Sequence, residues 1–69
     1  MDTREIFHDL EGRRKRLGLT VTAVADKAGI TTMTYRRWRH NTVQPTFENL
    51  LSVKAVIENA EDRLMGRAS

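Results

Sequence analysis

Cationic side chains gather in the middle of the chain, next to small hydroxyl and thioether side chains. The residues that form this group are Thr32, Met33, Arg36, Arg37, Arg39 and His40. A guanidinium group can donate two hydrogen bonds to the O6 and N7 atoms of guanine, and apolar or threonine methyl groups can contact the methyl group of thymine. The segment therefore combines side chains that are suited to reading base edges.

The sequence around these residues predicts two short helices that are joined by a tight turn. Thr20 is suited to cap a first helix over 21–28, and Gly29 is suited to a left-handed turn after it. Thr31 is suited to cap a second helix over 32–40. This arrangement indicates a helix-turn-helix, which places its second helix in the DNA major groove.

Helical spacing divides the second helix into an inner and an outer face. Tyr35 and Trp38 are three residues apart and share the inner face, where we expect core packing rather than stacking on single-stranded bases. The outer face holds the residues predicted to contact DNA bases, which are Thr32, Met33, Arg36 and Arg37.

Longer helices are expected on both sides of this pair. Asp2 can cap a helix over 3–17. Pro45 disfavours helix in the residue before it, so we expect the last helix over 47–64. Because helical periodicity is strong and strand alternation is missing, the sequence predicts an all-α fold. It would be one small helix-turn-helix domain over 1–69, with four or at most five helices and an extended C-terminal helix.

The charge distribution favours a polyanionic partner. The chain has 12 Lys and Arg against 9 Asp and Glu, a net charge of +3. Residues 1–42 hold nine cations and five acids, so the basic half is the half with the helix-turn-helix.

There is no cysteine, no long apolar run and no signal-peptide pattern. We therefore expect a cytoplasmic, nucleoid-associated protein that does not contact membranes.

The residue types do not suggest catalysis or a bound cofactor. His8 and His40 lie far apart in the sequence without a third ligand, so we expect no metal site. No serine, histidine and acid combination and no glycine-rich phosphate loop is present, so we expect no enzyme activity and no cofactor. We interpret His8, Asp9 and Glu11 as part of a polar helix face.

Phosphate contacts are expected from two places outside the base-reading face. Arg13 to Arg16 form a basic run, but successive helical residues point about 100° apart, so only one or two can reach one DNA backbone. We assign this role to Arg13 and Arg14. The start of the helix over 21–28, with Thr20 and Thr22 nearby, offers backbone N–H groups to a phosphate.

The last helix carries apolar residues at heptad spacing. They are Leu50, Val53, Ile57, Ala60 and Leu64, separated by three, four, three and four positions. The first two are expected in the core of the domain. The sequence predicts a homodimer interface at Ile57, Ala60 and Leu64. The alternative interface is the 41–46 loop with the start of the last helix.

Three stretches resemble a known family. They are LGLTVTAVADKAGI, TTMTYRRWRHN and QPTFENLLSV. Together they are similar to the lambda-repressor-like, Cro-type helix-turn-helix domains, also called the xenobiotic-response-element family, over about residues 6–57. The resemblance implies sequence-specific operator binding by a dimer, mostly in transcriptional repression or in the control of phages and mobile elements.

The resemblance also implies roles for single residues. Thr32, Met33 and Arg37 match positions that commonly contact base edges. Thr31 and Asn41 match positions that commonly contact phosphates. Val21 stands where the family often has glutamine, and only its backbone N–H can serve a phosphate.

The chain departs from the family pattern in three places. Many members pair an arginine of the first helix with a glutamate late in the recognition helix. Here Arg14 matches the first position but Arg39 matches the second, so we expect no charge pair and expect both side chains to face phosphate. Lys54 replaces a small core residue, and a fifth helix is missing.

The sequence therefore predicts a double-stranded DNA-binding transcriptional regulator, in particular a repressor that binds a near-palindromic operator as a homodimer. The alternative is an antitoxin or another protein-interaction module whose C-terminal segment, residues 56–69, binds a partner protein.

Overall fold

The computed structural model describes residues 2–68, in which four helices and no strand occur. The helices are α1 (Thr3–Leu17), α2 (Val21–Ala28), α3 (Thr32–Arg39) and α4 (Phe47–Ala68). The expected all-α fold with four helices and a long C-terminal helix is confirmed. α3 ends at Arg39, before the expected residue 40, and α4 continues past the expected end at Leu64. No helix of the described residues is both long enough and apolar enough to cross a membrane.

Residues at the helix ends fix where the short helices begin and stop. The hydroxyls of Thr20 and Thr31 each accept a hydrogen bond of 3.1 Å from the backbone N–H three residues further on. Such a cap satisfies one of the N–H groups that have no partner at a helix start. Gly29 has a φ of 76°, in the left-handed region that glycine adopts without steric cost. The chain can therefore turn tightly from α2 into α3.

Aromatic side chains from two helices form the centre of the core. The rings of Phe7 and Tyr35 lie edge to face with centroids 5.2 Å apart, and those of Phe7 and Trp38 do so at 5.6 Å. This geometry is the one that aromatic pairs favour. The other buried apolar residues of the core are Leu10, Val24, Ala25, Leu50, Val53 and Ile57.

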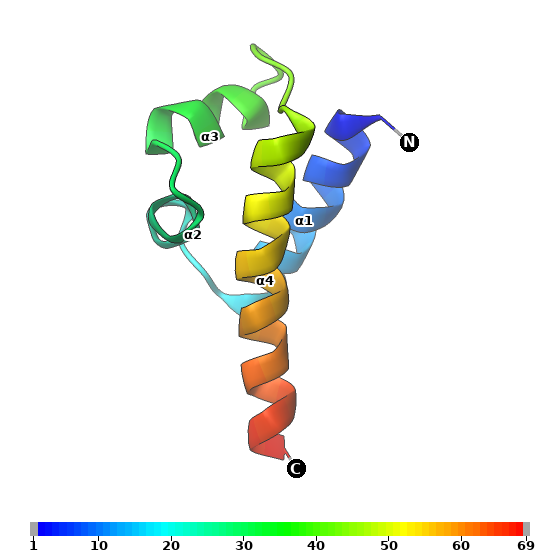
Figure 1. The fold of residues 1–69 in the computed structure, drawn as a ribbon, viewed down its shortest axis with the longest axis vertical. Coiled ribbons are helices and arrows are strands. Elements are labelled where there is room, and N and C mark those ends of the chain that lie inside the picture. The colour runs from blue at the N-terminus through cyan, green and yellow to red at the C-terminus, as the bar shows by residue number, and fades with distance from the viewer. Residues whose placement is uncertain (1, 69) are drawn as a thin grey trace.

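α4 is the element on which the other helices are arranged (Figure 1). It runs along the whole length of the molecule and contacts α1 and α2, while α3 packs on α2 and α1. The last turns of α4, towards the C-terminus, project beyond the other three helices (Figure 1). α3 lies near the opposite end of the molecule, so its outer side is not covered by α4.

Candidate nucleic-acid interface

The two faces of α3 differ in burial as helical spacing predicts. The side chains of Tyr35 and Trp38 are 0% and 3% exposed and face the core. On the other side Met33 is 62% exposed, Arg36 and Arg37 are exposed, and Thr32 is half-buried. The four residues predicted to contact bases therefore lie on one surface, which the core does not use.

Two residues of this outer face already contact each other. Arg37 Nη2 donates a hydrogen bond of 3.4 Å to Met33 Sδ, one helical turn away. A sulfur acceptor is weak, so this contact orients the guanidinium without occupying its other donors. The side chain of Arg36 forms no hydrogen bond or ion pair with any described residue. Both guanidinium groups therefore keep N–H groups that can donate hydrogen bonds to acceptor atoms of a nucleic acid.

The start of α2 lies in the helix-turn-helix as the sequence predicted. Thr22 is exposed, and the Thr20 hydroxyl, which accepts from Ala23 N, still has its own proton to donate. Val21 is half-buried and packs against the core, which explains why an apolar residue is suited to this position. The backbone N–H groups of this first turn point out of the helix end, where an anion is favoured.

The two remaining phosphate candidates lie at the ends of α3. The Thr31 hydroxyl caps the helix through Thr34 N and lies 2.8 Å from the Thr34 hydroxyl. Asn41 follows the helix with a φ of 59°, and its backbone N–H donates to Trp38 O at 3.2 Å. The Asn41 side chain is exposed. Asn41 therefore ends α3 through its backbone and leaves its amide group free for another role.

A buried carboxylate joins α1 to α3. Glu11 is 7% exposed and receives hydrogen bonds from Arg14 Nε at 2.6 Å and from the Tyr35 hydroxyl at 2.6 Å. Arg39 Nε, near the end of α3, lies 3.0 Å from the other carboxylate oxygen. Arg14 also donates to Leu19 O at 2.6 Å. One acid thus holds two cations and a hydroxyl group from two helices.

The family's charge pair between positions 14 and 39 is absent, as expected. Glu11 lies between Arg14 and Arg39 instead and forms an ion pair with each, which offsets their mutual repulsion. Glu11 is buried and does not lie on the polar helix face predicted for it from the sequence. Its position could have been a signal, since Phe7, Glu11 and Arg14 follow the spacing of a single helix face.

The charge state of this cluster follows from its surroundings. Burial raises the pKa of Glu11, but the hydrogen bonds from Arg14 and Tyr35 and the charges of Arg14 and Arg39 outweigh it, so the pKa lies below its ordinary value. Burial and the bond to Glu11 raise the pKa of Tyr35. Near neutral pH the carboxylate is ionised and Tyr35 is its donor.

Two residues of the basic run of α1, Arg13 and Arg14, are used inside the fold, whereas Lys15 and Arg16 are exposed. Arg14 is buried with Glu11, so we do not carry it into the proposed phosphate contacts. Arg13 points towards α4, where its guanidinium makes a two-point ion pair with Glu61, and it makes a longer ion pair of 3.7 Å with Asp9 of its own helix. The hydrogen bond to Glu61 raises the pKa of Arg13. This side of α1 is the one that faces α4 and not α3.

The predicted dimer residues do not form one exposed stripe. Ile57 is 0% exposed and belongs to the core of its own chain, so its assignment to a dimer interface is wrong. Ala60 is half-buried, and Leu64 is 55% exposed on the projecting end of α4. Met65, next to Leu64, is also exposed, and two further exposed apolar side chains, Phe47 and Leu51, lie at the other end of α4.

A family model described as helix-turn-helix matches residues 10–55, which include α2, the turn and α3. The chain belongs to the lambda-repressor-like helix-turn-helix family. The match ends within α4, so the projecting turns of that helix lie outside it.

A relative of this helix-turn-helix chain is the cryptic phage CTXphi transcriptional repressor RstR of Vibrio cholerae serotype O1 (strain ATCC 39315 / El Tor Inaba N16961). The two are 33% identical over 63 residues, which are 91% of this chain and 56% of the relative. The chain therefore spans about half the length of that curated relative. No solved structure is similar enough to count as a match.

The Glu11 cluster leads to a prediction on stability. Glu11→Gln should lower the free energy of unfolding by roughly 3 kcal/mol, because it leaves the buried Arg14 without its counter-charge. Because the pKa of Glu11 is lowered in the folded chain, the carboxylate contributes its full stabilisation above its unfolded pKa of about 4.3 and loses it as the pH falls through the folded value. The difference between the two proteins should therefore be constant near neutral pH and shrink in acid.

Urea unfolding followed by circular dichroism at several pH values measures this difference. Glu58→Gln is the matched control, because Glu58 is exposed. A gap between wild type and Glu11→Gln that stays unchanged down to strongly acidic pH would contradict the assigned role.

Proposed function

We propose that this chain is a sequence-specific, double-stranded DNA-binding transcriptional repressor that acts as a homodimer on a near-palindromic operator. The observation that carries the proposal is the outer face of α3, where Thr32, Met33, Arg36 and Arg37 lie together while the inner face is fixed in the core. The similarity to a protein named as a transcriptional repressor supports the regulatory part.

The side chains of α3 suit the chemistry of the major groove. Arg36 and Arg37 can donate two hydrogen bonds each to a guanine, and Thr32 and Met33 can contact thymine methyl groups. Arg39 uses Nε for Glu11, which leaves its two terminal nitrogens for a phosphate. The other proposed phosphate contacts are the first turn of α2 (Thr20, Val21 and Thr22) with Thr31 and Asn41. Bound at a promoter, such a protein would repress by occluding the polymerase.

Base recognition by Arg37 can be separated from general attraction to DNA. Arg37→Ala should cost about 1–3 kcal/mol in binding a selected operator and should relax preference at one base pair, because a two-point contact is lost. Arg13→Ala removes the same side chain from the α4 side of α1, and it should change affinity much less. Anisotropy titrations on duplexes that differ by single base pairs measure both effects. If Arg37→Ala weakens all duplexes by the same factor, Arg37 contacts only phosphate.

The exposed apolar residues near α3 are suited to pair two copies of the chain. Val43 is 46% exposed in the loop after α3, and Phe47 and Leu51, one turn apart on α4, are 61% and 49% exposed. This patch follows directly on the recognition helix, so pairing through it would fix the distance between two recognition helices. Adjacent half-sites on DNA require about 34 Å. The patch corresponds to the alternative interface that the sequence left open.

The double variant Phe47→Glu with Leu51→Glu should therefore be a folded monomer with much weaker operator binding, since the second half-site no longer contributes through linkage. Leu64→Glu with Met65→Glu is the matched control, because these exposed residues lie at the far end of α4. Light scattering coupled to size exclusion reports the mass, and circular dichroism reports folding. A control variant that becomes monomeric while the Phe47 and Leu51 variant stays dimeric would place the interface at the C-terminal end.

A further inference from the structure

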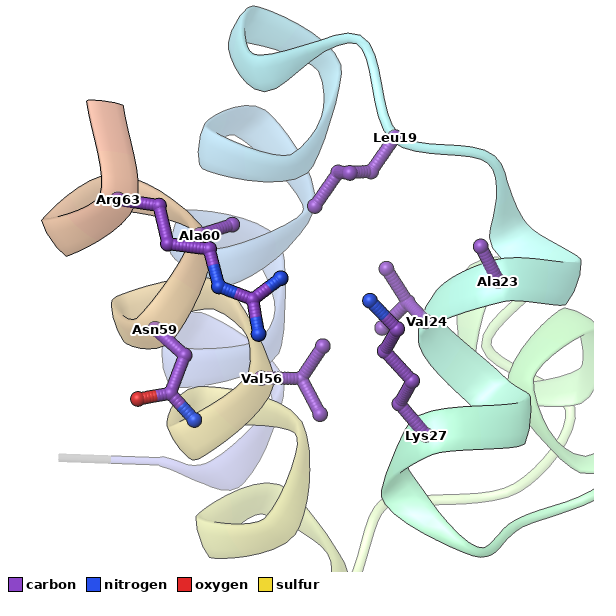
Figure 2. Close-up of a pocket in the computed structure, with 8 residues that line it drawn as sticks. All are labelled: Leu19, Ala23, Val24, Lys27, Val56, Asn59, Ala60 and Arg63. Carbon is purple, nitrogen blue, oxygen red and sulfur yellow. The ribbon is translucent and has the colours of Figure 1, made fainter. Parts of the chain in front are cut away.

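A groove with an apolar floor lies between α2 and α4, away from the outer face of α3. Figure 2 shows Leu19, Val24 and Val56 pointing into it from the α1–α2 turn, α2 and α4, with Ala60 on the α4 wall. Lys27 of α2 and Arg63 of α4 reach over it from opposite walls (Figure 2). The groove shares no residue with the proposed base-reading face.

The groove continues along α4 towards the C-terminus. A second hollow shares Leu19, Lys27, Ala60 and Arg63 with the first and adds Leu17 and Leu64. Leu64 is 55% exposed, because the end of α4 projects past α1 and α2. Together the two hollows form an extended channel with an apolar floor and polar rims between two helical walls, which is the shape that an amphipathic helix occupies.

The charges at the groove have one sign. Lys27 and Arg63 are its only charged lining residues in the part of the chain that the structure describes. Neither forms an ion pair with another described residue, whereas the nearby Glu61 is bound by Arg13 on the opposite side of α4. The groove therefore presents two unpaired cations above an apolar floor, and its complement is an apolar stripe flanked by carboxylates.

We propose that this groove docks an acidic amphipathic helix of a partner protein. Aliphatic side chains of that helix fill the hollow between Leu19, Val56 and Leu64, and its carboxylates pair with Lys27 and Arg63. A second copy of this chain fits less well, because groove-to-groove pairing would bring two sets of the same cations into one interface. DNA does not match the apolar floor. The inference goes beyond operator binding, since it gives the protein a second surface for a second partner.

The test uses the full chain and two synthetic helical peptides. The first carries a leucine stripe flanked by glutamates, and the second is identical except that lysines replace the glutamates. Nuclear magnetic resonance titration should show saturable binding of the acidic peptide, with shifts centred on Leu19, Ala23 and Ala60. The lysine peptide should bind at least about tenfold more weakly.

Charge reversal makes the test specific for the groove. Lys27→Glu with Arg63→Glu should remain folded, because both side chains lie over the groove without an internal ion pair, and it should reverse the peptide preference. Lys15→Glu with Lys54→Glu is the matched control, since both residues are exposed outside the groove, and it should keep the preference for the acidic peptide. Measuring the operator affinity of the variant with Lys27→Glu and Arg63→Glu shows whether the groove acts independently of the DNA-binding face.

Three outcomes would overturn the proposal. The first is equal binding of both peptides, and the second is shifts that map to α3 instead of the groove. The third is self-association of the protein that Leu64→Glu abolishes, because the occupant would then be a second copy of the chain.

Discussion

The geometry of this fold depends on a single buried carboxylate. Glu11 binds Arg14 on its own helix and Tyr35 and Arg39 on α3, so it is a polar connection between α1 and α3. A buried charge is costly unless its partners surround it. Here the hydrogen bonds from Arg14 and Tyr35 and the ion pair with Arg39 do so, and the cluster therefore permits few relative positions of α1 and α3.

This constraint matters because α3 is short. A helix of eight residues is not stable by itself in water, so its position must come from packing. Tyr35 and Trp38 supply the apolar part of that packing, and the bond from the Tyr35 hydroxyl to Glu11 adds direction. Once the inner face is fixed, Arg36 and Arg37 have only the outside to point to. The orientation of the proposed DNA contacts is thus determined from within the core.

Local signals in the sequence were sufficient for the helices but not for all side-chain partners. The caps Thr20 and Thr31 and the left-handed Gly29 act within a few residues, so α2, the turn and α3 could be predicted. The bond between Tyr35 and Glu11 joins residues that are 24 positions apart, and only packing of α1 on α3 brings them together.

The heptad spacing in α4 misled for a related reason. Spacing identifies the residues on one face of a helix, but it does not say whether that face packs on its own chain or on a partner. Ile57 is covered by its own core, whereas Leu64 extends past it. The lysine at position 54, where the family usually has a small core residue, is tolerated because this position of α4 faces solvent in this chain.

Selection of bound sequences from random duplex DNA by the full chain tests most directly whether α3, held by Glu11 and the aromatic core, reads double-stranded DNA in a two-fold arrangement. We expect enrichment of one near-palindrome whose half-sites lie about one helical turn apart, roughly 34 Å. Recovery of no preferred duplex sequence, or a preference for single strands, would contradict it.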